Sequence, residues 1–243
     1  MRRILNRFHS IIKELLYPPR CPICDEILAG EEGAEHICRE CRGQIRYIRE
    51  PRCMKCGAEL TDASQEYCKT CAMKKHVYDR GLALFRYESV RTSVYRLKYR
   101  GRKEYAEFYG REMARCFAQP IRYWKPEVLI PVPMHKAKER ARGYNQATAL
   151  AEVMGRYCGI PVRTDLVERR RKTRPMKELN AGERQINLKN AFHISQDVVK
   201  LKTVMLVDDI YTTGSTIDEI AKGLRAAGVA KVYYVALAIG SGQ

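Results

Sequence analysis

The chain has 243 residues, of which 45% are hydrophobic and 30% are charged, which indicates one or two globular domains and excludes a disordered protein. Lysine and arginine outnumber the acidic residues by 45 to 28, and the net charge of +17 favours a polyanionic partner or a phosphate-rich ligand. No run approaches the roughly 18 apolar residues that a transmembrane segment needs, and charges interrupt the N-terminal apolar pattern, which argues against a signal peptide. These features predict a cytoplasmic protein.

The N-terminal residues 1–19 are predicted to form an amphipathic helix. Apolar residues recur at helical spacing from Ile4 to Leu16, and Pro18 and Pro19 end the pattern. Such a helix either packs on its own protein or, because it carries arginines, lies on a membrane surface. The second alternative would place the protein at the inner face of the membrane without a transmembrane segment.

Eight of the ten cysteines form four Cys-x-x-Cys pairs between residues 21 and 71. A Cys-x-x-Cys turn directs two thiolates at one point, and two such turns complete a tetrahedral zinc shell. Residues 20–75 are too few and too polar to fold on an apolar core alone, so we expect about two structural zinc ions to stabilise this domain. The expected ligands are Cys21, Cys24, Cys38, Cys41, Cys53, Cys56, Cys68 and Cys71.

The spacing leaves the pairing of these turns open. Neighbouring pairs can share an ion, or the first pair can join the third and the second pair the fourth. A redox-active Cys-x-x-Cys is the competing interpretation, but it needs a thioredoxin-like strand and helix around it.

Residues 76–243 alternate between strand-like and helix-like patterns. Strands are expected at 80–87, 128–133, 204–207 and 232–239 and after Gly159, and helices at 105–117, 145–158 and 217–227. This alternation predicts an α/β domain with a parallel sheet. The last strand is too apolar for an edge of that sheet.

Residues 204–216 carry the clearest chemical pattern. Asp208 and Asp209 follow a short apolar strand, and ligands of open parallel sheets bind at the carboxyl ends of strands. A loop rich in hydroxyls then opens a helix, whose N-terminus presents N–H groups to a phosphate. This loop contains Thr212, Thr213, Gly214, Ser215 and Thr216. Together they fit a sugar phosphate, with an ordinary capped helix as the alternative; no Walker lysine or Gly-x-Gly-x-x-Gly motif is present.

Residues 91–103 are strongly basic and include two tyrosines but no acid. Cationic grooves with aromatic stacking platforms bind single-stranded nucleic acid without sequence preference. The candidate contacts are Arg96, Lys98, Tyr99, Arg100, Arg102 and Lys103. Alternatively, the tyrosines pack against their own domain.

The run from Asp208 to Thr216 resembles the phosphoribosyl-pyrophosphate (PRPP) motif of type I phosphoribosyltransferases. With the four cysteine pairs and the segments 97–101, 131–135, 140–146 and 184–192, the chain resembles the ComF family of competence proteins (ComFC, with GntX-like relatives) over residues 20–240. The resemblance implies an α/β fold in which a parallel-sheet type I phosphoribosyltransferase-like domain follows a small four-cysteine zinc-ribbon domain, a double zinc ribbon. One departure is Met176, at a position where the family usually has glutamine.

The resemblance also implies roles for individual residues. Asp208 and Asp209 would contact the ribose hydroxyls of PRPP, directly or around Mg²⁺, and residues 212–216 would hold the 5′-phosphate. The turn at residues 133–136 would line the pyrophosphate, and the basic stretch 168–178 would close over it and stabilise its charge. The expected contacts there are Pro133, His135, Lys136, Arg169, Lys172 and Arg174.

Two functions follow from the resemblance. The first is a role in DNA uptake during natural transformation, in which the protein binds PRPP and single-stranded DNA beside a ComFA-like ATPase. The second is an active Mg²⁺-dependent phosphoribosyltransferase that acts on a free base in cytosolic metabolism, with no role in DNA uptake. The resemblance favours transferase activity, while the sequence leaves the base acceptor and the oligomeric state open.

Overall fold

The computed structural model describes residues 18–170 and 191–240. Four parallel strands form the central sheet in the order β1–β6–β5–β2, which confirms the predicted α/β domain. Their bounds are β1 (Arg80–Arg86), β2 (Val128–Pro131), β5 (Thr203–Tyr211) and β6 (Lys231–Ile239). The apolar strand β6 lies inside the sheet, between β1 and β5, as its composition indicated.

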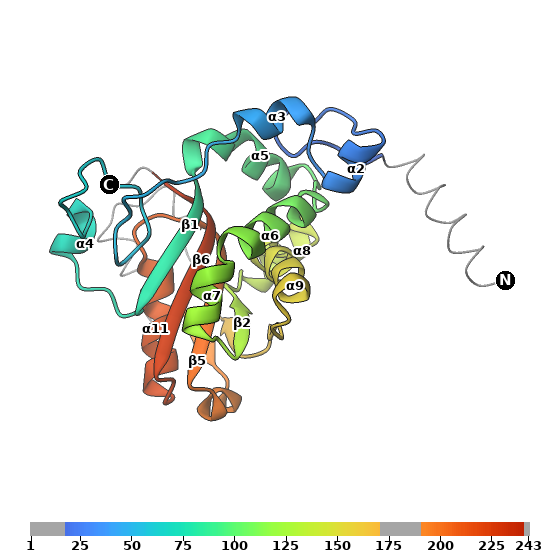
Figure 1. The fold of residues 1–243 in the computed structure, drawn as a ribbon. Helices are drawn as coiled ribbons and strands as arrows, with labels where there is room; N and C mark the ends of the chain where they lie inside the picture. The colour runs from blue at the N-terminus through green and yellow to red at the C-terminus, as the bar shows by residue number, and fades with distance from the viewer. Residues whose placement is uncertain (1–17, 171–190, 241–243) are drawn as a thin grey trace.

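Helices cover both faces of this sheet (Figure 1). Helix α11 lies on one face, and α6, α7 and α9 lie on the other. The bounds are α5 (Tyr87–Tyr99), α6 (Tyr105–Cys116), α7 (Ala118–Trp124), α8 (Lys136–Arg142), α9 (Gln146–Cys158) and α11 (Ser215–Ala226). Along β5, Val204 and Leu206 pack in the cluster that contains α11, whereas Met205 and Val207 pack with α6 and α9.

A short antiparallel pair stands apart from the main sheet. It consists of β3 (Val167–Arg169) and β4 (Phe192–Ile194), and the 3-10 helix η2 (Gln196–Lys200) follows. The strand that we expected after Gly159 does not form. Val162 makes only an isolated bridge with Leu129. Expected residues Lys172, Arg174 and Met176 lie outside the described residues.

The cysteine-rich part contains three short helices, α2 (Glu31–Glu35), α3 (Arg39–Gln44) and α4 (Lys69–Met73). Its first half packs beside α5 and α6, where Cys21 and Cys41 share a buried cluster with Leu97. Its second half packs beside α11, where Cys53 shares a cluster with Ile217. Figure 1 accordingly shows α3 and α4 at separate places on the molecule.

The chain between these halves runs along the outer edge of β1. The N–H of Ile48 donates to the carbonyl of Leu84 at 2.9 Å, and Tyr47 bridges Phe85. This pairing covers an edge that would otherwise be exposed. The helix expected within residues 1–19 falls, apart from its last two residues, outside the described part of the chain. Within 18–170 and 191–240, no helix has the length and apolar character needed to cross a membrane.

Candidate metal centres and phosphate-binding site

The eight paired cysteines form two groups, and in each group the four Sγ atoms lie within 4.8 Å of one another. None of them forms a disulfide. The Sγ atoms of Cys24 and Cys38 are 3.9 Å apart, and those of Cys56 and Cys68 are 3.7 Å apart. A tetrahedron with zinc–sulfur bonds of about 2.3 Å has sulfur–sulfur edges of about 3.8 Å, so both groups fit one structural zinc ion each. The first group is Cys21, Cys24, Cys38 and Cys41, and the second is Cys53, Cys56, Cys68 and Cys71, so neighbouring pairs combine.

Two predicted nucleic-acid contacts face the first cysteine group. Arg96 donates to the carbonyl of Ile23 at 3.0 Å, and Nε of Arg102 lies 3.2 Å from Oδ1 of Asp25. Asp25 also accepts a hydrogen bond from the hydroxyl of Tyr105. Burial by itself raises the pKa of Asp25, but the hydroxyl of Tyr105 and the guanidinium of Arg102 lower it below its ordinary value. These two arginines therefore join α5 and the following turn to the first zinc ribbon.

The acidic pair lies within β5, not after it as the sequence predicted. Strand β2 ends at Pro131, opposite Val207, while β5 continues beside β6 as far as Tyr211. The strand extends because its last residues keep backbone partners on β6. Beyond Val207, however, no strand among the described residues pairs with β5 on its β2 side. Asp208 and Asp209 thus lie just beyond the point where β2 stops pairing with β5.

Cations approach both carboxylates. Nζ of Lys98 lies 2.8 Å from Oδ2 of Asp209, and both side chains are largely buried. Burial, followed by the neighbouring carboxylate of Asp209, raises the pKa of Asp208 to about 8, against the opposing effect of Lys98 and Arg169. Burial lowers the pKa of Arg169 itself, while Asp208 opposes that shift. The structure therefore brings Lys98 and Arg169, from distant elements, to the acidic pair.

The loop that follows β5 surrounds a small hollow beside Asp208. Residues 210–217 line it together with that carboxylate. Gly214 has φ +72°, and a Cβ there would lie 2.5 Å from Oη of Tyr211 and 2.9 Å from Cε1 of His76. Both the left-handed backbone and the close approach thus require glycine. The hydroxyls of Thr213 and Ser215 lie 2.9 Å apart at the start of α11. Hydroxyls and a helix N-terminus around one hollow suit an anionic oxygen group.

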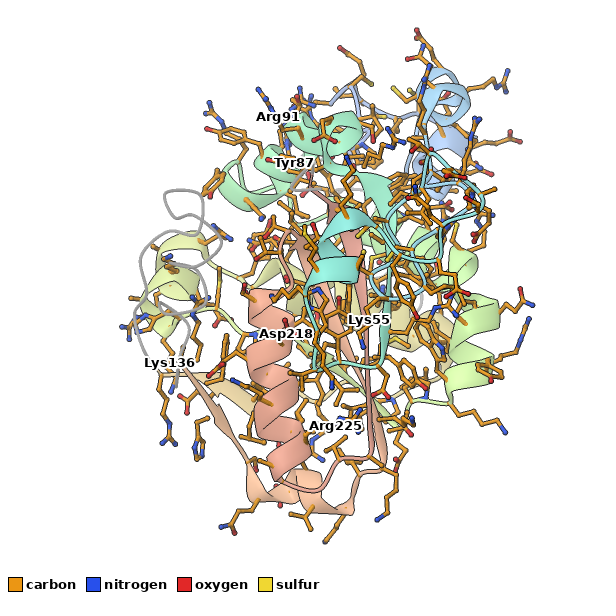
Figure 2. The ribbon with its side chains drawn as sticks, turned by 90° about the vertical axis from the view of Figure 1, so that its left-hand side faces the viewer. Lys55, Tyr87, Arg91, Lys136, Asp218 and Arg225 are labelled. Carbon is orange, nitrogen blue, oxygen red and sulfur yellow. The ribbon has the colours of Figure 1, made fainter. Side chains whose placement is uncertain are left out.

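A residue next to the second cysteine group contacts this loop, and the sequence analysis did not predict that contact. Lys74 follows α4, the helix that holds Cys71, and its Nζ donates to the carbonyl of Thr213 at 3.1 Å. The same ammonium lies 3.1 Å from Oδ2 of Asp218, which also lies 2.8 Å from Nδ1 of His76. Figure 2 shows Asp218 on α11. These partners are 139 to 144 residues apart, so no local pattern could have indicated them.

The predicted pyrophosphate turn is linked to β3, the strand that carries Arg169. His135 is the N-cap of α8, and its Nδ1 accepts the N–H of Ala137 at 3.2 Å. The exposed Lys136 places Nζ 2.6 Å from Oε1 of Glu168, just before Arg169. Pro133 is half-buried in the turn between β2 and α8. The turn is thereby tied to the base of the β3–β4 pair.

The outer face of α5 remains exposed. The side chains of Tyr95 and Tyr99 are 50% and 60% exposed, and their ring centroids lie 5.1 Å apart. The guanidinium of Arg142 lies 4.9 Å from the centre of the Tyr99 ring. Arg100 and Lys103, which follow the helix, are exposed as well. The tyrosines therefore do not pack into the core of their own domain.

The family assignment follows from three comparisons. Residues 12–72 match the family model of the double zinc ribbon domain. Competence protein F of Haemophilus influenzae is 34% identical over 213 residues, which cover 83% of this chain and 90% of that protein. This chain belongs to the competence protein F family. The ComF resemblance drawn from the sequence motifs is thereby confirmed.

Other members are also similar along most of their length. DNA utilization protein YhgH of Salmonella typhimurium is 30% identical, covering 90% of this chain and 96% of that protein. Competence protein ComFC of Bacillus subtilis is 27% identical, covering 81% and 80%. A solved purine phosphoribosyltransferase from Pyrococcus horikoshii aligns with 56% of this chain and 76% of its own, at 20% identity and a TM-score of 0.34. That score does not support a shared ligand.

Proposed function

We propose that this protein binds PRPP with Mg²⁺ at the carboxyl edge of its sheet and single-stranded DNA on the outer face of α5, as part of DNA uptake. The observation that carries the proposal is the acidic pair of β5 beside the hollow at the start of α11. Carboxylates suit ribose hydroxyls or a hard cation, and the hollow suits the 5′-phosphate. The turn at residues 133–136 then supplies the pyrophosphate side.

The DNA part of the proposal rests on the exposed tyrosines and on the relatives. Tyr95 and Tyr99 form a two-ring platform, flanked by the exposed cations Arg91, Arg100 and Lys103. Arg96, Lys98 and Arg102 are engaged by carboxylates and lie outside this platform. The names competence protein F and DNA utilization protein place those relatives in DNA handling. We extend that role to this chain, in the cytoplasm, with a ComFA-like ATPase as the proposed partner.

The second candidate is catalysis at the same site: transfer of ribose 5-phosphate from PRPP to a free base. It is favoured by Arg169, the second residue of the basic stretch that we expect to close over PRPP. The charge of Arg169 lowers the pKa of Asp208, which supports a position of this guanidinium near the acidic pair. A cation there would stabilise the charge of a leaving pyrophosphate.

Titration calorimetry and thermal unfolding with Mg²⁺ and PRPP test the binding site. Replacing Asp208 and Asp209 by asparagine should weaken binding by roughly 1.5–3 kcal/mol for each charged hydrogen bond that is lost. The exposed Asp165→Asn serves as the control and should bind as wild type. Absence of any PRPP-dependent stabilisation at millimolar ligand would refute the proposal. Pyrophosphate release with any free base would identify a transferase, whereas binding without release would favour a ligand-sensing role.

A further inference from the structure

The C-terminal turn of α5 belongs to both proposed sites. Lys98 and Tyr99 are consecutive residues, about 100° apart around the helix. Lys98 points inward, where its Nζ lies 2.8 Å from Oδ2 of Asp209 and its side chain is 18% exposed. Tyr99 points outward and is 60% exposed, beside Tyr95. A movement of this turn therefore acts on the acidic pair and on the tyrosine platform together.

The same turn also contacts residues that follow the proposed pyrophosphate turn at 133–136. Arg142, the last residue of α8, covers the ring of Tyr99 at 4.9 Å. The hydroxyl of Tyr144 donates to the carbonyl of Leu97. Helix α8 begins directly after His135, in the turn that we assign to the pyrophosphate. Two independent contacts thus connect the end of α5 with residues that follow that turn.

A ligand that binds Asp209 would deprive the charged Lys98 of its present counter-ion. The ammonium forms an ion pair with Asp209. A Mg²⁺ ion or a ribose hydroxyl that binds Asp209 takes over the carboxylate oxygen that the ammonium contacts. The displaced ammonium is largely buried, and a buried charge needs a new counter-ion. In the proposed complex, the pyrophosphate of PRPP would be that counter-ion.

We infer that Lys98 couples the two sites: it exchanges Asp209 for the pyrophosphate of PRPP, and the resulting shift of the last turn of α5 weakens single-strand binding at Tyr95 and Tyr99. This inference rests on the proposed function, because it requires that both ligands bind. Coupling between two sites of one protein is typically 5- to 150-fold, and it is reciprocal. PRPP should therefore raise the dissociation constant of the single strand at least about 5-fold, and the single strand should raise that of PRPP by the same factor.

The test measures the affinity for a fluorescein-labelled oligothymidylate by anisotropy, with and without saturating Mg²⁺ and PRPP. About 100 mM salt is used, because repulsion between charges more than about 10 Å apart is then largely screened. In the wild type, the dissociation constant should rise and reach a plateau as PRPP saturates. In Lys98→Met the ratio of the two constants should fall to about 1, and Lys98→Arg should restore part of the effect. Arg91→Met is the matched control on the outer face of α5 (Figure 2), and should weaken DNA binding while keeping the wild-type ratio.

Several results would overturn the coupling. A dissociation constant that rises without limit as PRPP is added would show that the two ligands compete for one site. If Lys98→Met kept the wild-type ratio of the two dissociation constants, PRPP would weaken DNA binding through residues other than Lys98. Binding of both ligands by the wild type with a ratio of 1 would reject the coupling alone, whereas failure of either ligand to bind would reject the proposed function as well. The reciprocal measurement on the wild type needs no variant, so it holds even where Lys98→Met does not fold.

Discussion

Replacing Lys74 by methionine should loosen the phosphate loop without disturbing either zinc site. The ammonium of Lys74 lies 3.1 Å from the carbonyl of Thr213 and 3.1 Å from Oδ2 of Asp218. The side chain of Lys74 is 32% exposed and that of Asp218 is 13% exposed, so water screens these contacts only in part. A hydrogen bond to a charged group contributes about 1.5–3 kcal/mol. Allowing for the exposure of Lys74, we expect a loss of about 1–2 kcal/mol, which corresponds to a 5- to 30-fold weaker affinity for PRPP with Mg²⁺.

Calorimetry of PRPP binding measures this loss, and elemental analysis checks that the zinc content is unchanged. The exposed neighbour Lys75→Met removes the same charge from the adjacent position and should bind PRPP as wild type. Lys74→Arg should retain most of the affinity, because it keeps a cation near Asp218. Equal affinities for Lys74→Met and Lys75→Met would refute the view that the second ribbon positions the loop. A loss of zinc in Lys74→Met would refute it too, by showing that the variant damages the ribbon instead.

Three further expectations concern zinc, acid stability and DNA. The purified protein should contain about two zinc ions, and Cys53→Ser should retain only the ion of the first group; elemental analysis that finds a single zinc in the wild type would contradict the geometry. Burial raises the pKa of Asp218, but its hydrogen bonds to His76 and Val77 outweigh burial and bring the pKa below its ordinary value. The stability that the ionised Asp218 gives the folded protein is therefore present above about pH 4 and is lost as the pH falls through the lowered pKa. Denaturant unfolding should therefore show a smaller loss of stability below pH 4 in Asp218→Asn than in the wild type, and equal losses would exclude the ion pair as the cause. For single-stranded DNA, three phosphate contacts, by Arg91, Arg100 and Lys103, predict a slope of about −2 between the logarithms of affinity and salt. Tyr99→Ala should cost about 1–3 kcal/mol of binding without changing that slope, and a loss of thermal stability in its place would assign the ring to packing.

The sequence by itself determined those features whose parts are close in the chain. A Cys-x-x-Cys turn directs two thiolates at one point wherever it lies, so the zinc-binding character of residues 21–71 was predictable. The acidic pair, the loop and the start of α11 are also contiguous, and Gly214 marks the position in this loop that needs a positive φ. Alternation of strands and helices was sufficient to predict the parallel sheet.

Tertiary structure alone decided which partner each charge meets. The sequence predicts that the basic residues between 91 and 103 form one surface. In the folded protein this segment forms α5 and a turn, and its cations have different partners: Arg96 and Arg102 pair with Asp25, and Lys98 pairs with Asp209. The extension of β5 through the acidic pair likewise depends on backbone partners that β6 supplies. The physical reason is that an ion pair or a strand partner is chosen by distances of a few ångströms between elements. Those distances are set when the elements pack. The contact between Lys74 and Thr213 joins residues far apart in the sequence, so the local spacing of residues does not indicate it.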